Sequence, residues 1–280
     1  WITDFTQIDP HLGTNAELKD LIAAAHDRGI KVYFDIIANH TADLIDYDEK
    51  EYTYIDTATS PYKDVEGKIV NVSELAGQAD FPDFHPDTRS FPRTPVRSAE
   101  NTVMVPEVLN DVTLYHNRGD STWSGESVTF GDFVGLDDLM TEDLVVVDTM
   151  IEIYKTWVDL GIDGYRIDTA KHVNFEFWQE FTTAVNAHAV AAANPDFFMF
   201  GEVYDADARL LSPYVRDTEM TSVLDFAFQS SALTYAKGLR ADGLTKLFAA
   251  DDYYTTDHSS ASALPTFLGN HDMGRVGRLL

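Results

Sequence analysis

Four apolar segments of this 280-residue chain each lead into polar residues that are able to do acid–base chemistry. The four polar clusters are Asn39-His40, Arg166-Ile167-Asp168 with Lys171-His172, Gly201-Glu202, and Asn270-His271-Asp272. A single Asp at the end of a strand is more often a helix N-cap than a catalyst. Four such clusters in series, each after an apolar segment, instead favour one shared site.

Breaking a glycosidic bond with retention of configuration would use two of the carboxylates. One carboxylate attacks the anomeric carbon, and a second acid protonates the leaving oxygen. Arg166 and Asp168 fall on the same face of a strand, so the arginine can keep Asp168 ionised as the nucleophile. Glu202 follows the apolar run Phe198-Met199-Phe200. Because apolar surroundings raise the pKa of a carboxyl group, Glu202 suits the role of general acid and base.

The remaining polar residues fit a neutral sugar. Asp272 would stabilise positive charge on the oxocarbenium-like ring, and His40 and His271 would donate hydrogen bonds to its hydroxyl groups. A metal-dependent hydrolase is a rival interpretation, but zinc sites usually gather several histidines, and each cluster here supplies one. A barrel that binds glucan without catalysis is another rival. Binding alone would not need the three carboxylates that the hydrolysis uses, and this sequence keeps all three.

Alternating helices and strands would bring the clusters together. The capping box Thr14-Asn15-Ala16-Glu17 predicts a helix over residues 15–28, followed by a strand over 30–37. The later predicted strands are 162–168, 196–202, 222–226 and 264–269, and the further helices are 143–160, 175–193 and 230–239. This rhythm predicts a (β/α) barrel or a doubly wound sheet. In a barrel, the carboxyl ends of the strands converge on one pocket.

The stretch from Thr41 to about Gly135 interrupts this rhythm. It is rich in Asp, Pro, Thr, Ser and Gly and has only short apolar runs. A structureless loop of that length is implausible in a compact domain, so the stretch predicts an inserted, irregular and β-leaning subdomain. Its aromatic residues, Trp123 among them, could stack on sugars or form a small core, and the core is the favoured interpretation.

Four of the segments resemble hallmark segments of the α-amylase superfamily, glycoside hydrolase family 13. They are Asp35–His40, Gly164–His172, Gly201–Asp205 and Asn270–Asp272. A fifth, Leu136-Asp137-Asp138-Leu139, is looser, because the family often has Leu-Pro-Asp-Leu-Asp there. Each motif alone is weak, but the five occur in the expected order and together are highly specific.

The resemblance implies a (β/α)₈ TIM-type barrel, incomplete in this chain, with a subdomain inserted after the third barrel strand. The implied division is barrel over residues 1–40, subdomain B over 41–138, and barrel strands four to seven over 139–280. By position, Asp168 is the nucleophile, Glu202 the acid/base and Asp272 the transition-state stabiliser. Arg166 is the partner of the nucleophile, and His40 and His271 bind the sugar that is cleaved.

The resemblance also implies a structural Ca²⁺ ion. Asn39, Asp138 and the backbone carbonyl of His172 would be ligands, and oxygen donors suit this hard cation. Lys171 and His172 resemble the pair that holds the glucan beyond the scissile bond, although a solvated helix start is the alternative. Asp35 is interpreted as structural, orienting nearby polar groups.

The expected activity is cleavage of internal α-1,4-glucosidic bonds in starch-like glucans. Gly269 precedes Asn270-His271-Asp272 where many amylases have Glu. This departure leaves a pullulan-, cyclodextrin- or α-1,6-acting relative open, and a transglycosylase would use the same residues. By the same resemblance we expect a monomer that works in the extracellular or periplasmic space.

The composition restricts the partners. The chain has 47 acidic and 20 basic residues and a net charge of −27, which argues against nucleic acid or an anionic membrane as a partner. A neutral substrate or a hard cation fits better. The acidity also fits a salty habitat, where ions screen self-repulsion, and activity in dilute and molar salt would test this. Since the chain has no cysteine, disulfides and thiolate chemistry are excluded.

Overall fold

A parallel sheet organises the molecule, for which a computed structural model describes residues 2–98, 103–240 and 242–280. The strands, in spatial order, are β1 (Tyr33–Ile37), β6 (Gly164–Asp168), β7 (Phe198–Gly201) and β8 (Ser222–Val223). All neighbouring pairs are parallel. The parallel sheet with intervening helices confirms the predicted α/β class, and the strands begin and end inside the predicted ranges.

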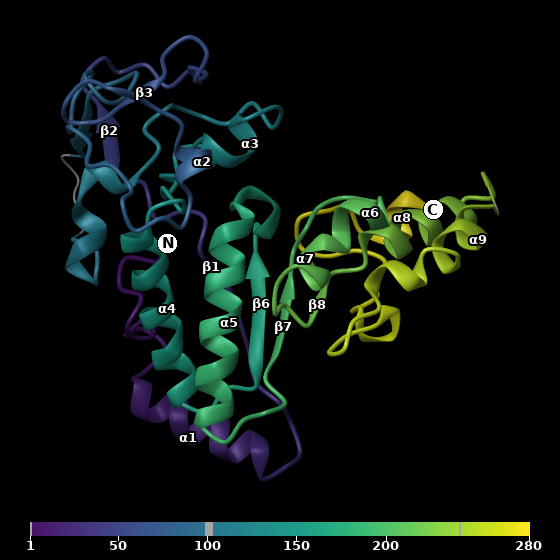
Figure 1. Ribbon diagram of the computed structural model, residues 1–280. Helices are drawn as coiled ribbons and strands as arrows, with labels where there is room; N and C mark the ends of the chain where they lie inside the picture. The colour runs from purple at the N-terminus through teal and green to yellow at the C-terminus, as the bar shows by residue number, and fades with distance from the viewer. Residues whose placement is uncertain (1, 99–102, 241) are drawn as a thin grey trace.

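Three helices accompany the sheet: α1 (Asn15–His26), α4 (Leu144–Asp159) and α5 (Phe175–Ala191). In Figure 1, α4 and α5 lie side by side along β1 and β6. The predicted capping box is confirmed, because the Thr14 side chain accepts from the Glu17 amide and the Glu17 carboxylate accepts from the Thr14 amide. The apolar faces of α4 and α5 meet the sheet in one core, where Met150, Phe181 and Ile167 are fully buried. This packing fixes the strands that carry the polar clusters.

The stretch between β1 and α4 forms short elements at the carboxyl end of the strands (Figure 1). They are β2 (Ile45–Tyr47) paired with β5 (Pro95–Arg97), β3 (Tyr62–Lys63) paired with β4 (Ile69–Val70), the helices α2 (Val72–Leu75) and α3 (Ser127–Phe130), and the 3₁₀ turns η1 (Glu107–Asn110) and η2 (Val112–Leu114). A small core of their own contains Tyr62, Phe91 and Phe130. The guanidinium of the fully buried Arg118 lies 4.2 Å from the centroid of the Tyr62 ring.

A buried charge network joins this region to the start of α4. His116 Nδ1 lies 2.6 Å from Asp138 Oδ2, and His116 Nε2 lies 3.0 Å from Glu142 Oε2. All three side chains are almost completely shielded from solvent. Burial by itself lowers the pKa of His116, but the two carboxylates outweigh it and raise the pKa to about 9. His116 is therefore a buried cation between two acidic groups.

The chain after β7 forms short helices that extend to one side of the sheet (Figure 1). They are α6 (Ala208–Leu211), α7 (Pro213–Arg216), α8 (Phe226–Ala236), α9 (Asp242–Phe248) and α10 (Val276–Leu279), with the 3₁₀ turns η4 (Asp251–Tyr254) and η5 (Ala261–Ala263). Within the described residues, no helix has both the length and the apolar character needed to cross a membrane.

The predicted strand over residues 264–269 is wrong. This segment runs beside the end of β8, and one backbone hydrogen bond, from the Asp225 amide to the Pro265 carbonyl at 3.1 Å, joins it there. Pro265 has no amide hydrogen to give to a ladder. The apolar residues of the segment satisfy the sequence pattern of a strand, but they make no regular pairing.

Candidate active site

The register of the sheet places the polar residues of β1, β6 and β7 next to one another. Asp35 lies opposite Arg166, and Ile37 lies opposite Asp168. The ladder continues past the end of β7, where the Glu202 amide donates to the Ile167 carbonyl at 2.8 Å. Glu202 therefore emerges at the carboxyl end of the sheet beside Asp168, where residues from several strands can act together.

Arg166 is the centre of this group, because its guanidinium contacts three carboxylates. Nη1 lies 2.7 Å from Asp35 Oδ1 and 2.5 Å from Asp168 Oδ1, while Nη2 lies 2.8 Å from Glu202 Oε2. Burial opposes the charged form of Arg166, but these carboxylates outweigh it and raise its pKa further. The arginine thus stays charged and holds Asp168 and Glu202 close to each other.

The surroundings of Glu202 favour its protonated form. Its side chain is 10% exposed, and burial raises the pKa of Glu202 above the usual value for a glutamic acid. The Arg166 charge lowers that pKa, and the neighbouring charges of Asp168 and Asp272 raise it. The apolar run before Glu202 predicts such a raised pKa. A raised pKa suits a group that must donate a proton.

A pocket of about 550 Å³ opens at this end of the sheet. Six of the residues singled out in the sequence line it: His40, Asp168, Lys171, His172, Glu202 and Asp272. The three carboxylates therefore face the same space. Lys171 is fixed at the edge, because its Nζ donates to the Tyr204 carbonyl at 2.9 Å and to Asp205 Oδ2 at 3.0 Å.

Asp272 and His271 lie in the exposed C-terminal segment. The His271 Nε2 atom is 3.1 Å from Asp272 Oδ2, and more than half of each side chain is exposed. Asp272 reaches the pocket, whereas His271 lies beside it and is not among the lining residues. Of the proposed sugar-binding histidines, His40 and His172 therefore line the pocket, and His271 does not.

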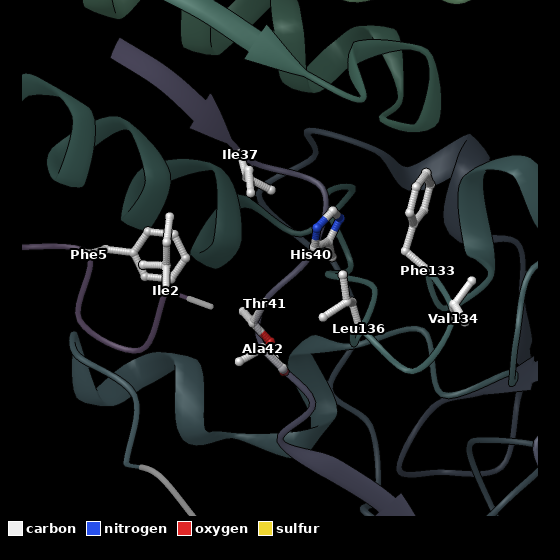
Figure 2. Close-up of a pocket in the computed structure, with 9 residues that line it drawn as sticks. All are labelled: Ile2, Phe5, Ile37, His40, Thr41, Ala42, Phe133, Val134 and Leu136. Atoms are coloured by element: carbon white, nitrogen blue, oxygen red, sulfur yellow. Dashed lines mark hydrogen bonds between the residues drawn. The ribbon is translucent and has the colours of Figure 1, made fainter. Parts of the chain in front are cut away.

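His40 separates this pocket from a second, apolar cavity of about 400 Å³. Figure 2 shows His40 at its centre, with Ile2 and Phe5 on one side and Phe133 on the other. The His40 ring stacks on Phe133 with 5.3 Å between the ring centroids. Burial lowers the pKa of His40 to about 4. His40 is therefore neutral near pH 7 and keeps one N–H for donation.

Two of the proposed calcium ligands meet. Asn39 Nδ2 lies 2.9 Å from Asp138 Oδ1, and both residues are buried. The ring of His172 has Nδ1 2.7 Å from the Val128 carbonyl, whereas the predicted ligand is the backbone carbonyl of His172, which stays a prediction. In the described part of the chain, no cluster of three or more His, Cys, Asp or Glu side chains is arranged to hold a metal ion.

Sequence reasoning missed several residues of the pocket. Trp123 and Tyr204 line it and have 51% and 58% of their surface exposed, so Trp123 does not belong to the small core that was the favoured interpretation. Thr169 also lines the pocket. The position of Thr169 directly after Asp168 was a usable signal. No sequence pattern separates the exposed Trp123 from the buried aromatic residues near it.

Comparison with known proteins identifies a family whose model matches the whole chain. The model of the family described as "Alpha amylase, catalytic domain" matches residues 1–280. An α-amylase of Streptomyces lividans is 53% identical over 284 residues, which cover 100% of this chain and 31% of that protein. A cyclomaltodextrin glucanotransferase of Niallia circulans is 28% identical, over 98% of this chain and 32% of its own length.

A solved structure of an α-amylase is also similar to this chain. The α-amylase of Geobacillus thermoleovorans, complexed with acarbose, has a TM-score of 0.65 and 26% identity, covering 100% of this chain and 49% of that one. The chain thus spans about a third of the length of the curated relatives it matches.

Proposed function

Because this chain belongs to the α-amylase catalytic-domain family, we propose that it forms the active-site region of a retaining hydrolase acting on internal α-1,4-glucosidic bonds of starch-like glucans. The observation that carries the proposal is the contact of one guanidinium, that of Arg166, with both Asp168 and Glu202. This contact keeps two carboxyl groups close together, as a retaining mechanism requires. The similarity to α-amylases supports the substrate class.

In the first step, the Asp168 carboxylate attacks the anomeric carbon. Glu202 gives its proton to the glycosidic oxygen, and that bond breaks as the glycosyl–Asp168 ester forms. Asp272 lies against the same pocket and stabilises positive charge that develops on the ring. In the second step, ionised Glu202 takes a proton from water, which attacks the anomeric carbon and releases Asp168.

The other pocket residues hold the glucan. The neutral His40 donates to a hydroxyl of the sugar that is cleaved, and we assign the same role to His271 in the substrate complex. Lys171 and His172 lie at the edge of the pocket and bind the sugar on the leaving side. The hydroxyl and ether oxygens of a glucan are neutral and can accept hydrogen bonds from these donors.

Transglycosylation is the second candidate, because cyclomaltodextrin glucanotransferases are among the relatives. In that case a sugar hydroxyl replaces water in the second step. Action on pullulan, on cyclodextrins or on α-1,6 bonds would use the same three carboxylates. A non-catalytic glucan-binding barrel is disfavoured, since Asp168, Glu202 and Asp272 all line one pocket.

Product analysis by the complete protein separates these candidates. We expect soluble starch to give linear malto-oligosaccharides of mixed length whose new reducing ends are first released as the α-anomer, as NMR would record. Cyclodextrins as the main product would favour the transferase, and preferential release of maltotriose from pullulan would favour α-1,6 cleavage. Release of the β-anomer, or no cleavage of any glucan, would contradict the proposed mechanism.

We also propose a structural Ca²⁺ bound by Asn39, Asp138 and the backbone carbonyl of His172. Asn39 and Asp138 are both buried and in contact, with Asn39 Nδ2 donating to Asp138 Oδ1 at 2.9 Å. Each side chain also carries a second oxygen-bearing face, and hard oxygen donors suit calcium. The Asn39–Asp138 contact joins the end of β1 to the segment before α4, so an ion there would hold the inserted region to the sheet.

Chelation by EGTA is expected to lower the melting temperature. A ligand present at 100 times its Kd contributes about 2.7 kcal/mol of stability, which is lost with the ion. Differential scanning calorimetry with and without added Ca²⁺ measures the change. Asn39→Ser should remove most of the response to EGTA, and Asn71→Ser, in the exposed start of α2, should leave it intact. An unchanged melting temperature in wild type would reject the calcium site.

We further propose that the complete protein is a monomer that acts in the extracellular or periplasmic space. A starch polymer outside the cell is too large to cross a membrane, so a hydrolase that acts on it must meet it outside the cytoplasm. Light scattering of the purified protein and activity in cell fractions check both statements.

A further inference from the structure

The residue after Asp168 has an unusual backbone. Thr169 has φ 51° and ψ 29°, which is the left-handed region. A β-branched residue there is a genuine outlier, and such a conformation costs about 1–3 kcal/mol. Among the described residues, the other non-glycine residues with positive φ include Trp123 and Val134. Trp123 lines the same pocket, and Val134 lines the adjoining apolar cavity. Half of the described non-glycine residues with positive φ therefore line these two cavities, and Lys50, Asn117 and Ala193 do not.

The turn that contains Thr169 is held from several sides. The His172 amide donates to the Thr169 carbonyl at 2.9 Å, and Trp178 Nε1 donates to the Ala170 carbonyl at 3.0 Å. The methyl group of Ala170 lies close to Gly201, since a Cβ added to Gly201 would lie 3.1 Å from that methyl carbon. Strain of this kind persists where the surroundings fix it. Contacts from α5, from His172 and from the end of β7 thus hold the turn that contains Thr169.

This conformation directs polar groups of Thr169 at the site. Its amide N–H points at Glu202 Oε2, 3.5 Å from the nitrogen, and this contact lowers the pKa of Glu202 against the larger effect of burial. The Thr169 hydroxyl is buried and has no hydrogen-bond partner in the described protein. Buried polar groups are normally paired, and Thr169 lines the catalytic pocket. A partner for this hydroxyl is therefore sought among the groups that face the pocket.

We propose that Thr169 is a positioning residue for Glu202, whose amide and hydroxyl together hold the carboxylate that forms when Glu202 protonates the leaving sugar. This inference rests on the proposed function. The amide of Thr169 already faces the Glu202 carboxylate, and the hydroxyl can take any of three staggered positions about the Cα–Cβ bond. We assign it the position that faces the same carboxylate. After the proton has moved to the glycosidic oxygen, the carboxylate accepts from both donors. It then takes a proton from the attacking water, and both contacts loosen again.

Four variants of the complete protein test the proposal through the pH dependence of kcat/KM on a malto-oligosaccharide. Thr169→Ser keeps the hydroxyl, and Thr169→Ala removes it while keeping the left-handed backbone. Thr169→Gly removes both the hydroxyl and the strain. Ala193→Gly is the matched control, because Ala193 has φ 63° between the end of α5 and the amino end of β7 and is not among the residues that line the pocket.

The alkaline limb of the profile reports loss of the proton from the general acid. We expect Thr169→Ala to move it upward by about one pH unit, a tenfold change in ionisation that a hydrogen bond to a charged group can supply. Thr169→Ser and Ala193→Gly should match wild type. Thr169→Gly should melt at a higher temperature than Thr169→Ala, yet its alkaline limb should stay displaced.

An alkaline limb that stays in place in Thr169→Ala overturns the proposal, whether or not the variant is less stable. A raised KM with an unmoved limb also overturns it, because the hydroxyl would then bind substrate. If wild type cleaves no glucan, the proposed function itself fails. That result is distinct from a cleaving enzyme whose Thr169 variants behave like wild type.

Discussion

Replacing Glu202 with Gln is expected to lower kcat on starch by about 10²–10⁴-fold, the contribution of a positioned general acid. Asp168→Asn should lower it at least as much, because no covalent intermediate then forms. Circular dichroism and melting temperature should stay close to wild type. Asp207→Asn is a matched control on the surface, since Asp207 pairs with the exposed Arg209, and its kcat should be nearly normal.

The two variants should differ in how they respond to the substrate. An aryl glucoside of a very acidic phenol releases its phenolate without protonation. The rate at which the intermediate forms should therefore fall far less for Glu202→Gln on this substrate than on starch. For Asp168→Asn, that rate should fall by the same factor on both substrates. Near-normal turnover of starch by either variant would refute the assignment of its residue.

The largest effect on stability is expected at His116. His116→Gln leaves Asp138 and Glu142 buried without their cation, and breaking a buried pair costs about 3–5 kcal/mol. His188→Gln is the control, because the His188–Asp159 pair at 2.7 Å is partly exposed and such pairs contribute about 0–1 kcal/mol. Denaturant unfolding with EGTA in every sample separates this effect from metal binding.

A loss below about 1 kcal/mol in His116→Gln would mean that the network carries little stability. Glu142→Gln offers a second measurement, because it removes one of the two acidic partners and leaves Asp138 to balance the cation. We expect it to cost less than the loss of His116. A greater cost for Glu142→Gln would contradict a role of His116 as the central charge.

Much of the fold was predictable from local signals. The capping box at Thr14 fixes the start of α1 through contacts within four residues, and the apolar runs before Asp168 and Glu202 are short parallel strands. Because parallel strands end at one edge, the convergence of these carboxylates followed from the order of elements. The roles given to them remain predictions that the variants above test.

The features that could not be predicted depend on contacts between distant residues. Asn39 meets Asp138 across 99 positions, and only the family resemblance, not the residues around either one, placed them together. The segment 264–269 has the composition of a strand, but pairing depends on its neighbour, and only one backbone bond forms at Pro265. His116 looks like an ordinary loop residue until Asp138 and Glu142 surround it.

The shared guanidinium of Arg166 has a consequence for inhibitors. It is one positive group among Asp35, Asp168 and Glu202, with Asp272 facing the same pocket. Even with Glu202 protonated, the three aspartates outnumber Arg166, and Lys171, which lines the pocket, is already paired with Asp205. This excess of negative charge would attract a sugar-like ring that carries a basic nitrogen near the anomeric position. It would repel the same ring carrying a phosphate ester. The site should therefore select by ionic character as well as by shape.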